Sequence, residues 1–127
     1  TLKTQVEAAE GPVLFINQRH LLTFGNINVP LVPDYETVTL METAMSNNQQ
    51  VLEQFYDDLR ENRYAMIISG RQNLLLKTEG AFIEEDNTWK TRISPYILCY
   101  YESADTIEPT QGRIEIYVPR AEPGKCP

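Results

Sequence analysis

The most constraining feature of the sequence is residues 46–70, where a helical pattern runs directly into a short apolar segment. The first part has apolar residues at helical spacing, namely Leu52, Phe55 and Leu59. The last part, YAMIIS, is a wholly apolar run, like the earlier PVLFIN at residues 12–17. Because parallel strands are covered on both faces and are connected through helices, this order predicts a parallel βαβ unit.

A second helix is expected just before this unit, over residues 35–45. Val38, Met41 and Met45 recur at helical spacing and predict its buried stripe. Ser46, followed three residues later by a glutamine, then resembles a capping box and is expected to be the N-cap of the next helix.

Two further strands are expected near the C-terminal end. The apolar run YILCYY at residues 96–101 predicts a third parallel strand, and the alternating RIEIYV at 113–118 predicts an antiparallel edge strand beside it. We therefore predict an α/β domain of two or three layers, with a mostly parallel sheet of about four strands and one antiparallel edge strand.

The chain has 127 residues, of which 42% are hydrophobic, enough for one domain with its own core. We assign residues 12–119 to this domain, 1–11 to a linker and 120–127 to a C-terminal tail. Because the first residue is Thr1 and no signal-peptide-like apolar region precedes the domain, we expect the chain to be an excised piece of a longer protein.

The charge balance argues against a nucleic-acid partner. The chain has 11 Lys and Arg against 18 Asp and Glu, a formal net charge of −7. Binding to a phosphate backbone or an anionic membrane surface needs a basic face, and the sequence offers none. A moderately acidic surface simply keeps a small domain soluble.

The two cysteines, Cys99 and Cys126, form neither a disulfide framework nor a CxxC metal motif. Cys99 lies in an apolar run, where a cysteine usually behaves as a small hydrophobic residue. Their spacing leaves open whether they are bridged.

Polar residues follow the predicted parallel strands, at the edge of the sheet where open α/β folds bind ligands. The candidate ligand-binding residues are Asn17, Arg19, His20, Ser69 and Arg71. With Glu102 beyond the third strand, they would suit an anionic or polyhydroxylated ligand, through charge-assisted hydrogen bonds. The alternative is that these are ordinary polar residues where strands reach solvent.

No catalytic or metal-binding motif stands out. Ser69 and His20 are a conceivable nucleophile and base, but the G-x-S-x-G elbow is missing. The acidic run at residues 84–86 lacks the alternating ligand spacing of a calcium loop. We predict no catalytic residue, no metal site and no cofactor in this chain.

Three strings carry a family resemblance: GPVLFINQRHLLTFG at residues 11–25, the long run from VPLVPDYE to YAMIISG at 29–70, and YILCYYE at 96–102. In these the chain resembles the soluble C-terminal region of bacterial, often cyanobacterial, multi-spanning membrane proteins. Those proteins are related to lipid-phosphate-sugar glycosyltransferases of the dolichyl-phosphate-mannose or aminoarabinose transferase type.

The resemblance implies an accessory domain on the extracytoplasmic side of the cell membrane, joined through residues 1–11 to a membrane-spanning region upstream of Thr1. Its expected partners are that region and a lipid-linked sugar or acceptor glycan. The catalytic acid of such enzymes belongs to the membrane portion, so none of the family's catalytic residues maps onto this sequence. Two alternatives stay open: a self-contained sugar- or nucleotide-binding module, and a structural or oligomerising domain.

Overall fold

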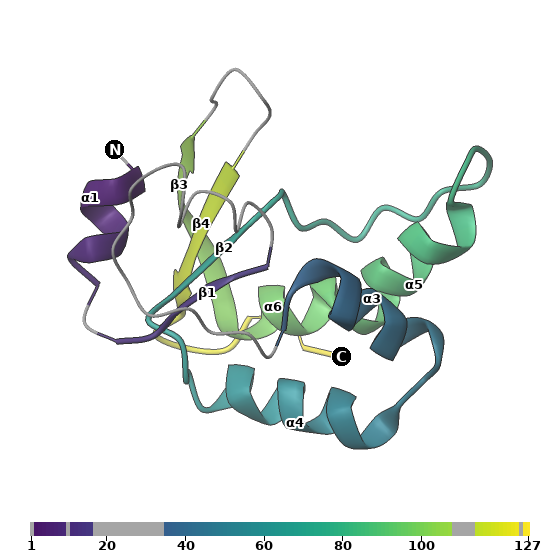
Figure 1. Ribbon diagram of the computed structural model, residues 1–127, viewed down its shortest axis with the longest axis horizontal. Coiled ribbons are helices and arrows are strands. Elements are labelled where there is room, and N and C mark those ends of the chain that lie inside the picture. The colour runs from purple at the N-terminus through teal and green to yellow at the C-terminus, as the bar shows by residue number, and fades with distance from the viewer. Residues whose placement is uncertain (1, 10, 17–34, 108–113, 125) are drawn as a thin grey trace.

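The computed structural model describes residues 2–9, 11–16, 35–107, 114–124 and 126–127. The described elements are, in chain order, α1 (Leu2–Glu7), β1 (Val13–Phe15), α3 (Thr37–Met45), α4 (Gln49–Arg60), β2 (Met66–Ser69), α5 (Ile83–Arg92), α6 (Ser94–Tyr100), β3 (Tyr101–Ile107) and β4 (Ile114–Pro119). Helices α3 to α6 gather on one side of a single sheet, and α1 lies on the other side (Figure 1).

The sheet is mixed, with four strands in the order β1-β2-β4-β3. Strands β1 and β2 are parallel, with Leu14 opposite Ile67, so the predicted parallel pair is confirmed. Strand β4 is antiparallel to both β2 and β3. The α/β class is therefore confirmed, whereas the expected mostly parallel sheet is not: among the described strands, one pairing is parallel and two are antiparallel.

The prediction of a strand at residues 96–101 is wrong. Most of that run forms α6, and β3 begins only at Tyr101. Proline is favoured in the first turn of a helix, and Pro95 takes that position in α6. Within α6, Ser94 and Ile97 are buried and lie three residues apart, the spacing of neighbours on one helix face. A short apolar run fits a buried helix as well as a strand.

The predicted edge strand is also misplaced, although its antiparallel pairing with β3 is confirmed. β4 lies inside the sheet, between β2 and β3. Alternate residues of β4 point to opposite faces of the sheet, and both faces are buried. Ile114 and Ile116 pack with α1, and Tyr117 packs with the other helices. Glu115 lies among these residues and is only 3% exposed.

The boundary between α3 and α4 differs from the predicted capping box. Ser46 is the C-cap of α3, and Asn48 is the N-cap of α4, its side chain accepting the backbone N–H of Val51 at 3.4 Å. Between them Asn47 has a φ of 52°, a left-handed conformation that asparagine adopts more readily than most residues. That turn moves the cap two residues along the chain.

The buried face of α3 is also different from the predicted stripe. Leu40, Thr43 and Ala44 are buried, whereas Val38 and Met45 are 59% and 36% exposed. The predicted residues do have helical spacing. The rest of the protein, however, covers the part of the α3 surface next to them.

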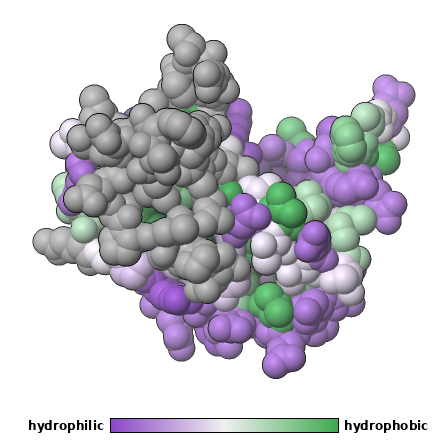
Figure 2. Space-filling model, viewed as in Figure 1, coloured by the Kyte–Doolittle hydropathy of each residue, from purple (hydrophilic) through white to green (hydrophobic). Residues whose placement is uncertain are grey.

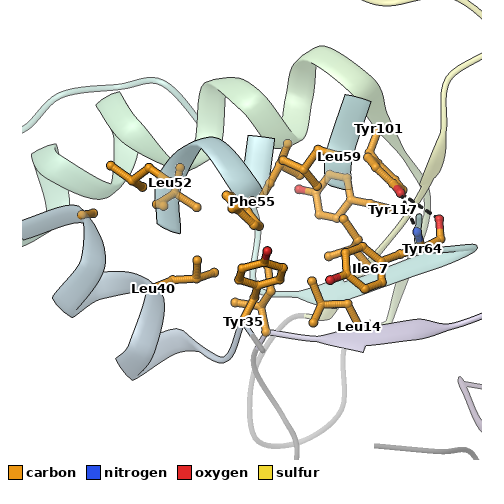
Figure 3. Packing of buried hydrophobic residues seen from close by; sticks show 14 residues of the cluster. Leu14, Tyr35, Leu40, Leu52, Phe55, Leu59, Tyr64, Ile67, Tyr101 and Tyr117 are labelled. Atoms are coloured by element: carbon orange, nitrogen blue, oxygen red, sulfur yellow. Dashed lines mark hydrogen bonds between the residues drawn. The ribbon is translucent and has the colours of Figure 1, made fainter. Parts of the chain in front are cut away.

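The main core lies between the sheet and α3, α4 and α6. Leu52, Phe55 and Leu59 of α4 are buried as predicted, and the ring of Tyr35 meets Phe55 edge-on at 4.8 Å between centroids (Figure 3). The opposite face of the sheet packs on α1 through Val6, which is 1% exposed.

Tyr101 joins the start of β3 to the chain entering β2. Its hydroxyl donates to the carbonyl of Tyr64 at 2.8 Å and accepts the backbone N–H of the same residue at 3.2 Å (Figure 3). Both residues are fully buried, so this double hydrogen bond satisfies backbone groups that water does not reach.

We expect the buried phenol of Tyr101 to make the protein less stable at high pH. Burial raises its pKa from 10.0 to about 12, although its hydrogen bond to Tyr64 opposes the shift. The folded state therefore holds this proton more tightly than the unfolded state. Its contribution is complete below pH 10 and is lost as the pH rises towards 12. Urea unfolding measured across this range should show the fall.

The variant Tyr101→Phe is the control for this pH dependence. It should be less stable by about 1–3 kcal/mol at neutral pH, because it removes both hydrogen bonds between the phenol and the buried backbone of Tyr64. Its free energy of unfolding should fall less steeply with pH than that of the wild type. If the free energy of unfolding of the variant fell equally steeply with pH, the effect would belong to other tyrosines. Tyr35 is one of these, because burial also raises its pKa.

Candidate functional site

The structure describes two of the five predicted ligand-binding residues, Ser69 and Arg71, both at the carboxyl end of β2. Asn17, Arg19 and His20 lie outside the described residues. Ser69 is fully buried and donates to the carbonyl of Gly70 at 2.7 Å, so its hydroxyl faces the protein interior. Arg71 is exposed, and its guanidinium makes no hydrogen bond or ion pair within the described part of the chain.

Arg71 stands between two surface hollows. The first, called here the sheet hollow, has a volume of about 270 Å³ and lies over β3 and β4. The second, the helix hollow, has a volume of about 210 Å³ and lies against α3 and α5. The residues that matter below are, in the sheet hollow, Ser103, Thr106, Glu115, Tyr117 and Arg120 and, in the helix hollow, Thr37, Asp86 and Trp89.

Gln72 is the wall between the two hollows and holds the backbone of Arg71 in place. Its side-chain amide donates to Ser69 Oγ at 3.2 Å and to the carbonyl of Gly70 at 3.3 Å. Its amide oxygen accepts from Trp89 Nε1 at 3.0 Å and from Ser94 Oγ at 2.6 Å. An amide has two donor hydrogens and two acceptor lone pairs, so this side chain is fully used within the protein.

The floor of the sheet hollow contains a buried carboxylate. Glu115 Oε2 accepts from Ser103 Oγ at 2.6 Å and from Thr106 Oγ1 at 2.8 Å. Beside it the hydroxyl of Tyr117 accepts the backbone N–H of Gln72 at 2.8 Å. These contacts hold oxygen atoms of a carboxylate, two hydroxyls and a phenol in fixed positions under one small hollow.

The outer rim of the sheet hollow is Arg120. Its Nε donates to the carbonyl of Leu98 at 2.9 Å and to that of Tyr101 at 3.1 Å, and its Nη1 lies 3.5 Å from the carboxylate of Glu102. The guanidinium is therefore anchored at its inner nitrogen, with the outer nitrogens directed to the rim. The sheet hollow is therefore lined by two cationic side chains, Arg71 and Arg120, and two acidic ones, Glu102 and Glu115.

The C-terminal tail is held beside this rim by a disulfide. Cys99 and Cys126 are bridged, with their Cα atoms 4.8 Å apart. Between them the N–H of Gly124 donates to the carbonyl of Cys99 at 2.7 Å. A Cβ atom at Gly124 would stand 3.2 Å from Nε of Arg120, so the glycine lets the tail lie close against the guanidinium. The bridge, which spacing had left open, is therefore part of the site's architecture.

The helix hollow is more simply built. Asp86 pairs with Lys77, and Thr37 donates to the carbonyl of Ile16 at 2.7 Å. The indole of Trp89 is already bonded to Gln72. These three groups are occupied within the protein, whereas Arg71 and Lys90 also line the helix hollow. We place the candidate site in the sheet hollow, because a buried carboxylate and two guanidiniums line it together.

The groups that line the sheet hollow are suited to hydrogen bonding. Here the serine and threonine hydroxyls both donate to Glu115 from the strand surface. No group of three or more His, Cys, Asp or Glu residues able to hold a metal ion occurs in the described part of the chain.

Sequence reasoning missed most of this site. Glu115 lies at a polar position of an alternating strand, the usual pattern for a side chain in solvent, so nothing local marks it as buried. Gln72 lies in the polar triplet RQN and carries no signal either. Arg120 was assigned to the tail, and only the disulfide and the pairing of β4 bring it to the rim. Of the five candidate ligand-binding residues, Arg71 lines the hollow among the described ones, together with Glu102, which was expected to join them.

Comparison with known proteins adds no relative: no protein family, curated protein or solved structure matched this chain. In the described part of the chain, no helix combines the length and the apolar character needed to cross a membrane. The likeness to glycosyltransferase-related membrane proteins therefore stays a prediction from sequence.

Proposed function

We propose that this chain is an extracytoplasmic accessory domain of a membrane glycosyltransferase-like protein, and that it binds a polyhydroxylated ligand such as a sugar ring without catalysing a reaction. The observation that carries the binding part is the sheet hollow, which is lined by the buried carboxylate of Glu115 and by Arg71 and Arg120. The glycosyltransferase part is supported by the sequence resemblance alone.

A sugar ring suits this hollow for a physical reason. Each sugar hydroxyl both donates and accepts, and a hollow lined by charged donors and a charged acceptor can satisfy several hydroxyls at once. Hydrogen bonds to charged groups contribute more than those between neutral groups. The hollow has a volume of about 270 Å³, slightly below the usual range for small-molecule sites, which suits a monosaccharide.

The disulfide supports the extracytoplasmic location. Disulfides form and persist in oxidising compartments, including the bacterial periplasm and the cell surface, and are rare in the cytosol. Cys99 and Cys126 are separated by 27 positions in the sequence, and their bridge closes the C-terminal tail onto α6.

An exposed apolar segment supports the accessory role. Between β2 and α5, Leu74, Leu75, Leu76 and Phe82 are 54%, 78%, 59% and 73% exposed. Figure 2 shows hydrophobic surface along this segment, which extends away from the sheet in Figure 1. The amide of Asn87 bonds to the N–H of Lys77 at 2.7 Å and to its carbonyl at 2.9 Å, and so ties the segment to α5. We assign this surface to contact with the rest of the parent protein.

The binding part predicts a saturable response to sugars. We expect titration with a panel of neutral monosaccharides, followed by NMR of the backbone amides, to shift the signals of Arg71, Gln72 and Thr106. Replacing Arg71 with alanine should weaken the binding about tenfold, the effect of losing a hydrogen bond to a charged group. Fold and stability should be unchanged, since this side chain is exposed.

The matched control is Arg60→Ala, which removes another exposed arginine, on α4 and away from the sheet hollow. It should leave the sugar response unchanged. Equal loss in both variants, or no saturable shift with any sugar, would count against the binding part. The accessory part has a separate test: the full-length parent, assayed for lipid-linked sugar transfer with and without this region, should lose activity when the region is deleted.

A further inference from the structure

A third hollow, independent of the proposed function, lies between α4 and α6. It has a volume of about 300 Å³ and is called here the tyrosine groove, being lined by Glu53, Tyr56, Asp57, Arg60, Tyr96 and Tyr100. The α4 residues recur at spacings of three and four, and the α6 tyrosines are four apart, so each helix presents one face to the groove.

The aromatic part of the groove is rigid. The rings of Tyr56 and Tyr96 are stacked, with centroids 3.6 Å apart and planes inclined by 13°. The hydroxyl of Tyr56 also donates to the carbonyl of Arg92 at 2.8 Å. Burial, and then the neighbouring Tyr96, raises the pKa of Tyr56 to about 12, so the phenol stays neutral near physiological pH. All three tyrosines are partly exposed.

The charged part of the groove is unbalanced. Arg60 pairs with Asp57, one turn away on the same helix. Glu53 is exposed, and its carboxylate has no hydrogen bond or ion pair with any described residue. Two carboxylates against one guanidinium leave the groove with a net negative charge beside tyrosine rings.

We propose that the tyrosine groove binds a small organic cation. Its ammonium head would lie against the tyrosine rings on one side and near the carboxylate of Glu53 on the other. The faces of aromatic rings carry partial negative charge and attract an organic ammonium, and aromatic cages for quaternary ammonium groups use this attraction. Glu53 adds direct charge complementarity. The pairing of Asp57 with Arg60 leaves Glu53 as the available anion.

Choline and its neutral carbon isostere, dimethylbutanol, test this proposal, since they share shape and hydroxyl group and differ in charge. NMR titration of the isolated chain should show saturable shifts of the amides of Tyr56, Tyr96 and Tyr100 with choline. The affinity for dimethylbutanol should be about tenfold lower. Glu53→Gln should weaken choline binding about threefold, as for an exposed charge pair.

Glu61→Gln is the matched control, because it makes the same change at the exposed C-cap of α4, outside the groove. It should leave choline binding unchanged. Equal affinity for the neutral isostere, an equal loss in both glutamine variants, shifts confined to other regions, or no saturable shift with choline would each overturn the proposal. Because both changed residues are exposed, circular dichroism should show that all variants remain folded.

Discussion

Replacing Phe55 with alanine is expected to destabilise the fold by about 3–5 kcal/mol, the usual cost of removing a fully buried phenylalanine. Phe55 has no exposed surface, and it lies between Leu52 and Leu59 of α4 against the ring of Tyr35 (Figure 3). The cavity left by the ring would open at the centre of the main core, where the sheet holds its surroundings in place. Urea unfolding followed by circular dichroism measures the change.

Gln54→Ala is the control for this prediction, since it changes the neighbouring, exposed residue of the same helix. Its effect should be within about 0.5 kcal/mol, as for surface substitutions in general. A comparable loss of stability in both variants would mean that α4 itself is fragile. A loss well below about 2 kcal/mol in Phe55→Ala would mean that the core refills the space, against the packing described here.

Removing the disulfide through Cys126→Ser is expected to cost about 3–4 kcal/mol in the chain-entropy description of a cross-link of this span. The bridge joins residues 27 positions apart and ties the tail to α6. Without it the unfolded chain gains conformational freedom. The tail also loses its tether beside Arg120, so the amide signals of Gly124 and Arg120 should shift as well.

Reducing agent supplies the control for the disulfide prediction. Under reduction the wild type should fall to the stability of Cys126→Ser, while the variant should not respond. A variant as stable as the oxidised wild type would show that the bridge contributes nothing to the fold. It would also remove the main support for an oxidising compartment, because a bridge without structural effect is poor evidence of where the protein functions.

The features predicted correctly from sequence are those set by short-range periodicity. The buried stripe of α4 follows from apolar residues at helical spacing. The pairing of β1 with β2 follows from two fully apolar runs that need cover on both faces. Each of these patterns is local: the helix stripe lies within one continuous segment, and each apolar run lies within its own.

The candidate site depends on contacts that no single stretch contains. Arg71 was recognised because it follows a strand, but the groups around it come from β3, β4 and the tail. Glu115 is buried only because β4 lies between β2 and β3 and not at the edge. Arg120 reaches the rim only because β4 ends beside the start of β3 and the disulfide holds the tail there.

By itself, then, the sequence determined the α/β class, the parallel pair and the amphipathic helix, because hydrophobic periodicity is local and is written in the order of the residues. Only the tertiary structure decided that residues 94–100 form a helix, that β4 lies between β2 and β3, which faces of α3 and β4 are buried, and that Cys99 meets Cys126. These outcomes depend on competition between distant segments for the same buried surface. Local propensity is a weak guide to that competition, because packing and long-range strand pairing routinely override it.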